Sequence, residues 1–282
     1  MTTATNGADD LALDQWYPLS ALPEIPPGRT STTMLLDRDV RYSIDEEAVP
    51  MAWRRSGEEL PIREDYGYLW TCLGDAPEDL FHDPAVEETD RRSFNTCTFG
   101  ILTSAPRAVE NFLDMAHLPI VHAGLLGEMP YSEIVDYGLE VSDEEVLATK
   151  CWIYQPKASA ASTTGMMVDY TFKVVHPTCA FLYKSSPVDE ERLDVVGLFC
   201  QPVRSDFVRA HLWDARLDEH NTNTQVRRFG QTILAQDKPV LENQLPKELP
   251  LAGEVPVRSD KTGAAYRRWL YDMGWTYGVI RD

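Results

Sequence analysis

An alternating pattern of apolar and polar residues between about residues 133 and 216 constrains the fold of this chain more than any other feature. Segments such as EVLATKCWIYQ, MMVDYTFKVVHP and VVGLFCQPV follow this pattern and are separated by turn-forming residues. Alternation of this kind is typical of half-buried strands. We therefore expect a curved sheet of about five antiparallel strands.

A first helix is predicted just before the sheet. Thr103 or Ser104 can cap it, and Pro106 suits its first turn. The helix should run through RAVENFLDMAH, where apolar residues recur at helical spacing. Pro119 should end or bend it, because proline cannot donate the next backbone hydrogen bond.

Two more helices are predicted after the sheet. The first spans about 221–244 and should be kinked by Pro239, and the second spans about 259–273. A curved antiparallel sheet that wraps around a long C-terminal helix is the simplest architecture for this order of elements. The fold class is therefore α+β.

The N-terminal third of the chain has a different sequence pattern. Residues 1–14 are predicted to be a disordered tail, and residues 15–95 a small β lobe broken by prolines and followed by a polar connector. The main domain should then cover residues 96–282.

The chain is strongly acidic, with 26 basic against 45 acidic residues and a net charge of −19. Such a surface repels phosphate backbones, so nucleic acid is a poor partner. It favours a partner with a positive patch, or simply keeps the protein soluble. The sequence shows neither a signal peptide nor a membrane span, and we expect no membrane association and a cytoplasmic location.

The five cysteines are widely spaced and include no C-x-x-C pair. This spacing argues against a zinc ribbon, a thioredoxin-like motif and a disulfide framework. Buried thiols in a reducing compartment are the expectation.

Two of the six histidines, His117 and His122, are five positions apart. On an ideal helix they would point about 140° apart and could not share a metal ion. Pro119 lies between them, and a break there would let the two rings converge. Asp114 is one helical turn before His117. Spacing alone leaves two interpretations, a metal site or unrelated polar side chains near a helix end.

The surrounding residues resemble a known family. ENFLDMAHLPIVHAGLLGE follows the pattern N-x-x-D-x-x-H-x-x-x-x-H of Rieske-type oxygenases that hydroxylate aromatic rings or demethylate N- and O-methyl groups. ILAQDKPVLENQ resembles the helix that supplies their carboxylate ligand. The resemblance implies a helix-grip (START-like) catalytic domain that holds mononuclear Fe(2+) through His117, His122 and Asp237. Such a ligand set leaves positions on the metal open for O2.

Other residues of these two segments are candidates for supporting roles. Asn111 and Glu110 are candidates to accept hydrogen bonds from the ring N–H groups of the histidines. Ile233 and Leu234 share a helical face with the predicted carboxylate ligand and are expected to line a substrate pocket. Gln231 is a candidate to hydrogen-bond a polar heterocycle. Ordinary packing or surface roles stay open for all five residues.

A Rieske cluster needs a C-x-H and a C-x-x-H pair. No cysteine precedes Cys72, and neither Cys72 nor Cys97 is followed by histidine at either spacing. WYPLSALPEIPPG and EDYGYLWTCLGD nevertheless resemble the flanks of the family's N-terminal Rieske domain. We therefore expect a truncated, vestigial Rieske-like lobe and no [2Fe-2S] cluster in this chain.

Two explanations account for a retained iron site without a cluster. In the first, the chain is an O2-dependent monooxygenase that receives electrons, originally from NAD(P)H, through a separate Rieske-cluster-bearing reductase. In the second, it is a non-catalytic structural or ligand-binding subunit of a mixed complex. In the family, the aspartate matching Asp114 lies on the electron path to the iron, and its retention favours the first explanation.

The first explanation also implies a reaction. Within the family, the chain is similar to the type of 7-methylxanthine N-demethylase subunit that lacks a Rieske domain. That similarity implies oxidative N- or O-demethylation of a small aromatic or purine substrate, with release of formaldehyde. The family forms trimers, so a homo- or hetero-trimer is expected.

Overall fold

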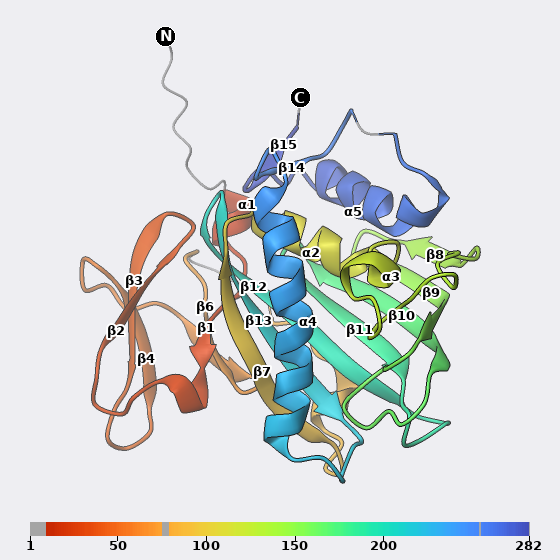
Figure 1. The fold of residues 1–282 in the computed structure, drawn as a ribbon. Helices are drawn as coiled ribbons and strands as arrows, with labels where there is room; N and C mark the ends of the chain where they lie inside the picture. The colour runs from red at the N-terminus through yellow and green to blue at the C-terminus, as the bar shows by residue number, and fades with distance from the viewer. Residues whose placement is uncertain (1–9, 75–78, 254, 282) are drawn as a thin grey trace.

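The main body of the protein is built on one seven-stranded antiparallel sheet, as seen in a computed structural model that describes residues 10–74, 79–253 and 255–281 (Figure 1). The strands follow the order β7-β13-β12-β11-β10-β9-β8. Six of them come from the alternating region, where about five were expected. The strands are β7 (Arg92–Ile101), β8 (Gly138–Val141), β9 (Val146–Gln155), β10 (Met166–His176), β11 (Cys179–Ser185), β12 (Leu193–Arg204) and β13 (Phe207–Arg216).

Alternation along the strands separates the two faces of the sheet, and in the central strand β12 both faces are buried. In β10, for example, Val168, Tyr170, Phe172 and Val174 are buried while the residues between them are more exposed. β12 is buried at nearly every position because both of its faces are covered. One face of the sheet packs against helices and the other against the N-terminal region.

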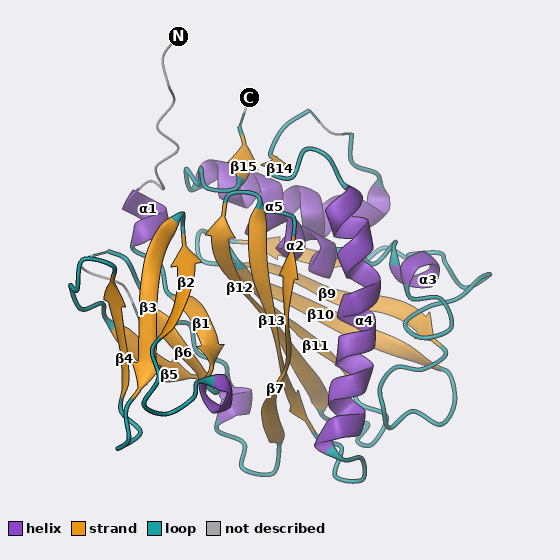
Figure 2. Cartoon of the chain, turned by 60° about the vertical axis from the view of Figure 1, so that its left-hand side comes forward, coloured by secondary structure: helices purple, strands orange, loops and turns teal. Residues whose placement is uncertain are grey.

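The helices of the main body lie on the first face of the sheet or along its edge (Figure 2). α2 packs on β12 and β13, α4 on β7, and α5 on β8 and β9. None of the helices in the described residues is long and apolar enough to cross a membrane. The helices are α2 (Ala105–Leu113), α3 (Leu118–Val121), α4 (Asn223–Asn243) and α5 (Lys261–Asp272).

α2 begins as predicted but ends earlier. Ser104 caps it by accepting the N–H of Arg107. The helix stops at Leu113, because Oδ1 of Asp114 accepts the N–H of Ala116 at 2.7 Å and gives the backbone an alternative to the helix. Pro119 does not end this helix. It lies in the first turn of the separate helix α3, where a missing N–H is tolerated.

α4 is the long predicted helix. Thr222 and Gln225 form a capping box at its start. The helix continues through Pro239 to Asn243. Its buried face consists of Val226, Gly230, Leu234, Asp237 and Leu241.

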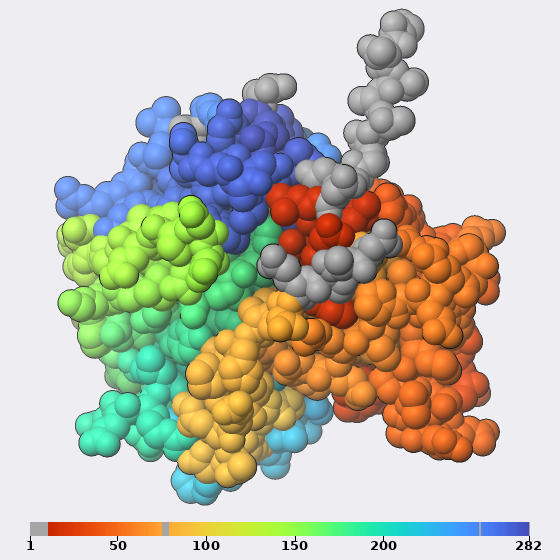
Figure 3. Space-filling model, turned by 180° about the vertical axis from the view of Figure 1, so that it is seen from behind, coloured from red at the N-terminus to blue at the C-terminus, as the bar shows by residue number. Residues whose placement is uncertain are grey.

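The N-terminal region forms two three-stranded sheets that stand beside the main body (Figures 2 and 3). The first sheet has the order β1-β6-β5 and the second β2-β3-β4. Of the tail predicted over residues 1–14, residues 1–9 lie outside the described part, and Asp10–Leu13 forms helix α1. The strands are β1 (Tyr17–Ala21), β2 (Ser31–Leu35), β3 (Arg38–Ile44), β4 (Pro50–Arg54), β5 (Ile62–Asp65) and β6 (Tyr68–Thr71).

An aromatic cluster joins this region to the second face of the main sheet. Tyr66 contacts the rings of Phe181, Phe199 and Trp213 at centroid distances of 5.0–5.8 Å. Contacts of this kind add to the free energy gained by burying the rings. All five cysteines are buried and free, as expected from their spacing. A two-stranded pair, β14 (Leu249–Pro250) and β15 (Val279–Ile280), brings the C-terminal segment against the body.

Candidate metal centre

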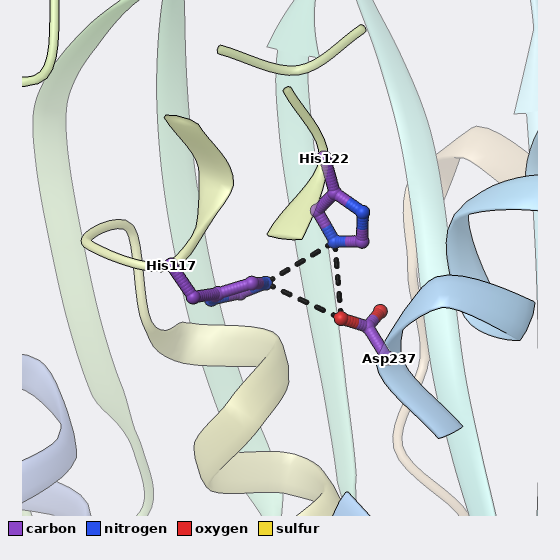
Figure 4. Close-up of side chains that lie close together, drawn as sticks. All are labelled: His117, His122 and Asp237. Carbon is purple, nitrogen blue, oxygen red and sulfur yellow. Dashed lines mark hydrogen bonds and ion pairs between the residues drawn. The ribbon is translucent and has the colours of Figure 1, made fainter. Parts of the chain in front are cut away.

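Three side chains from different segments converge at the cavity between the sheet and α4. His117 precedes the first turn of α3, His122 follows its last turn, and Asp237 lies in α4. Oδ1 of Asp237 is 3.0 Å from Nε2 of His122 and 3.4 Å from Nε2 of His117. The two Nε2 atoms are 3.2 Å apart, so one atom of each residue faces a common point (Figure 4).

The outward ring nitrogens are hydrogen-bonded, which determines where each ring carries its proton. Nδ1 of His117 donates to Oδ2 of Asp114 at 3.2 Å, and Nδ1 of His122 donates to Oε1 of Gln236 at 2.8 Å. An imidazole protonated at Nδ1 presents its unshared electron pair at Nε2. When neither Nε2 atom carries a proton, both electron pairs point toward Asp237, which is the arrangement that metal ligation requires.

The spacing of these three atoms fits a divalent iron ion. Three ligands on one face of an octahedron, each about 2.1 Å from the metal, lie about 3 Å from one another. The observed separations of 3.0, 3.2 and 3.4 Å agree with this value. Within the described residues, Oδ1 of Asp237 is buried and accepts no hydrogen bond, so a cation would stabilise it.

The pKa values of the site show how strongly it attracts positive charge. Burial lowers the pKa of His117, but the neighbouring carboxylates of Asp114 and Asp237 outweigh burial and raise the pKa to about 9. Burial raises the pKa of Asp237, but the two histidines outweigh it and lower the pKa to about 2. Two carboxylates beside two imidazoles thus leave an excess of negative charge, which a proton or a metal ion can balance.

The partners predicted for the histidine N–H groups were wrong. Glu110 forms an ion pair with Arg267 of α5, and Asn111 lines the adjacent cavity. Their positions are taken by Asp114 and Gln236. The role of Gln236 could not be predicted, because nothing in the local sequence shows that the side of α4 that carries Gln236 meets the end of α3.

The three side chains lie in the wall of a cavity of about 100 Å³. Most of the wall is apolar and includes Phe112, Phe172, Leu182, Leu198 and Leu212. Such a lining suits a flat aromatic molecule and keeps bulk water out.

Two of the three predicted pocket residues line this cavity. Ile233 and Leu234 precede Asp237 by four and three positions, which places them on the same face of α4. Gln231 does not line it. It precedes Asp237 by six positions, is exposed on another side of the helix, and donates to the carbonyl oxygen of Thr96 at 3.4 Å. The prediction for Gln231 was therefore wrong.

Asp114 lies between this cavity and the outside of the molecule. Its side chain is 37% exposed and lines both the cavity and an outer groove of about 520 Å³. Four arginines line the groove: Arg107, Arg267, Arg268 and Arg281. The side chain of Asp114 therefore connects a molecule bound in the groove to His117.

Residues 101–274 match the family described as the vanillate O-demethylase oxygenase C-terminal domain. The chain belongs to this family. It is also 40% identical to the probable methylxanthine N7-demethylase NdmC of Pseudomonas sp. (strain TJI-51), over 97% of this chain and 98% of that protein. The chain is therefore an oxygenase, as its motifs indicated.

Solved structures of oxygenases show the same fold. The methylxanthine N1-demethylase NdmA of Pseudomonas putida CBB5, solved with caffeine, superimposes with a TM-score of 0.76 and 20% identity, over 94% of this chain and 92% of that one. Dicamba monooxygenase bound to dicamba superimposes with a TM-score of 0.74 and 11% identity, over 95% and 98% of the two chains. The expected α+β fold with an antiparallel catalytic sheet is confirmed.

Proposed function

We propose that this oxygenase is the iron-containing subunit of an N-demethylase for methylxanthines, and that its electrons come from a Rieske cluster on a separate reductase. The convergence of two histidine electron pairs and one carboxylate in an apolar cavity carries this proposal. Similarity to the probable methylxanthine N7-demethylase along nearly the whole chain supports N-methyl over O-methyl substrates.

Fe(2+) held by His117, His122 and Asp237 would supply the activation of O2. In the overall reaction, an N-methyl group, O2, two electrons and two protons give an N–H group, formaldehyde and water. The methyl C–H bond is oxidised first, and the resulting N-hydroxymethyl group then releases formaldehyde. A single oxygen atom enters the substrate, so the reaction is a monooxygenation.

The residues of the chain orient the site and shield it. Asp114 and Gln236 hold the two rings in the tautomer that ligates a metal. The apolar wall excludes water, which protects a reactive site from side reactions. A flat purine would fit between the sheet and α4, with its methyl group at the three converging side chains.

The partner would bind at the outer groove. Asp114 is exposed there and reaches His117, so it provides a short path for an electron from a docked cluster. The cysteine and histidine spacing required for a Rieske cluster is missing from the sequence. We interpret the two N-terminal sheets, residues 15–95, as a vestigial Rieske-like lobe and the rest as a helix-grip catalytic domain.

Location and assembly complete the proposal. Five buried free thiols suit a reducing compartment, so we place the protein in the cytoplasm. A homo- or hetero-trimer would follow the ring arrangement that the resemblance implies.

Turnover tests this function. Iron-loaded protein with 7-methylxanthine, NADH and a Rieske-bearing reductase should release formaldehyde and xanthine in equal amounts. No product should form without the reductase. Asp114→Asn should keep its iron and lose about 10- to 100-fold of the coupled rate. Iron-loaded protein that yields no formaldehyde from 7-methylxanthine would favour a non-catalytic subunit instead.

A further inference from the structure

Four buried polar side chains form a row across one end of the helix-facing side of the sheet. Tyr170 of β10 is paired in register with Lys184 of β11, and Lys184 with Asp194 of β12. Arg216, at the end of β13, reaches Asp194 at 3.3 Å. Tyr170, Lys184 and Arg216 line the same cavity as the three converging side chains. The cavity thus has a second polar region, built by the sheet.

The two cations of this row differ in their partners. Arg216 is held by Asp214 and Asp194. The ammonium group of Lys184 is held only by neutral groups: the carbonyl of Ala158, Oε1 of Gln155 and the ring face of Tyr170, whose centroid is 5.4 Å away. In the described part of the chain, no carboxylate lies within 4.0 Å of it. Lys184 is therefore a buried amine that has no counter-ion when it is protonated.

A cation in this position is costly for the fold. Lys184 is 3% exposed, and burial lowers the pKa of its amine to about 7. A buried charge is kept at such a cost only when something compensates for it. Two neutral acceptors use two of the three ammonium hydrogens, and the third can donate into the cavity.

The Arg216 end of the polar row and Asp237 lie at different points along α4. A methyl group added at Gly230 of α4 would lie 3.8 Å from Oδ2 of Asp214, a carboxylate that holds Arg216, so this part of the helix lies near the Arg216 end of the row. Asp237 is seven residues further along, or about 10 Å at 1.5 Å per residue. Lys184 and the three converging side chains line one cavity, so a bicyclic molecule bound there can contact both, with the apolar wall between them.

We propose that Lys184 determines substrate specificity by donating a hydrogen bond to an acceptor on the substrate, such as a ring carbonyl oxygen, across the ring from the methyl group that is oxidised. This inference rests on the proposed function, because it takes the cavity as the substrate site. The substrate class is an N-methylated planar heterocycle that carries an acceptor on its second ring. A purely apolar aromatic ring would leave the cation unsatisfied.

Two probes and one variant separate this role from a structural one. 7-Methylxanthine carries carbonyl oxygens on its six-membered ring, whereas 1-methylbenzimidazole keeps the N-methylated five-membered ring and has no polar atom on the other. Binding to iron-loaded protein is measured by calorimetry. Lys184→Met should weaken 7-methylxanthine binding about 10- to 100-fold, the usual range for a hydrogen bond to a charged group. Its affinity for 1-methylbenzimidazole should change less than about twofold.

Two further variants complete the experiment. Lys184→Gln keeps an N–H donor and should give the same ligand-dependent pattern with a smaller loss, and it replaces Lys184→Met if that variant does not fold. Lys173→Met removes a lysine of the neighbouring strand β10, which pairs with Glu145 outside the cavity, and should leave both affinities unchanged.

Different outcomes of these binding measurements would overturn the role of Lys184 and the proposed function. Equal losses for both probes, or no loss for 7-methylxanthine, would overturn the role of Lys184 while the proposed function stands. Wild-type protein that does not bind 7-methylxanthine at all would overturn both.

Discussion

The two hydrogen bonds on the outer sides of His117 and His122 are the contacts that turn a pair of histidines into a candidate metal site. Asp114 lies on the same loop as His117, whereas Gln236 comes from α4, more than a hundred residues away. Gln236 also precedes Asp237 directly, so a single turn of α4 supplies both a candidate ligand and the hydrogen-bond partner of another candidate ligand. The position of α4 thus decides whether the site exists.

Gln236→Leu should lower the iron affinity about 10- to 100-fold, because His122 loses the acceptor that fixes its tautomer. Iron retained after dialysis against graded chelator measures this change. Gln231→Leu is the matched control, since Gln231 is an exposed residue of the same helix and contacts no ring. Equal iron retention in the two variants would contradict a supporting role for Gln236.

Lys184 should also make stability depend on pH. Burial and then Arg216 lower its pKa from 10.5 to about 7, against the opposing effect of Asp194 and Asp214. Between these two values the unfolded chain keeps a proton that the folded chain has released, so the contribution of Lys184 to stability rises with pH.

Unfolding of the wild type and of Lys184→Met in urea, at about pH 7 and about pH 9, measures this dependence. Wild-type stability relative to the variant should rise by up to about 1.4 kcal/mol per pH unit. A constant difference would mean that Lys184 keeps its ordinary pKa in the fold.

At the level of elements, the sequence predicts what depends on local pattern. Alternation identified the sheet, and helical spacing identified α4 and the pocket residues Ile233 and Leu234. The end of α2 could not be read in this way, because Asp114 competes for the backbone through its side chain. The buried row around Lys184 was equally hidden, since it depends on the register of separate strands.

Gly230 allows α4 to approach the sheet. A methyl group there would come within 2.5 Å of Cγ2 of Thr96 and 3.2 Å of Cδ2 of Leu212. Gly230→Ala should therefore push the helix outward, lower stability by about 1–3 kcal/mol and weaken iron binding. Thermal melting and iron content measure these effects.

Gly263 of α5 is the control for this prediction. A methyl group there would meet nothing closer than 3.6 Å, so Gly263→Ala should stabilise the protein by about 0.4–1 kcal/mol. A similar loss of stability in both variants would show that the close contact with the sheet does not explain the effect at Gly230.

On the scale of the whole molecule, the arginine-lined groove is a local exception on a chain with a net charge of −19. A partner that docks there should depend on these arginines and on ionic strength. The N-terminal lobe stands on another part of the surface and offers a comparison (Figure 3).

Arg268→Glu should raise the KM for the reductase about three- to tenfold, because it reverses one charge in the groove. Arg55→Glu is closely matched, since both arginines are exposed and each pairs with one aspartate, Asp272 or Asp39. Arg55 lies after β4 of the N-terminal lobe and should leave the KM unchanged. Equal effects would place the docking surface elsewhere.

The iron content of purified protein is the sharpest test of the site formed by His117, His122 and Asp237. After anaerobic loading with Fe(2+) and removal of free metal, the wild type should retain about one iron per chain, as one three-ligand site requires. His117→Ala and Asp237→Ala should each lose it, while His220→Ala, which removes an exposed histidine, should retain it. Wild-type protein that holds no iron, or variants at positions 117 and 237 that hold as much as the wild type, would show that these three residues do not form an iron site.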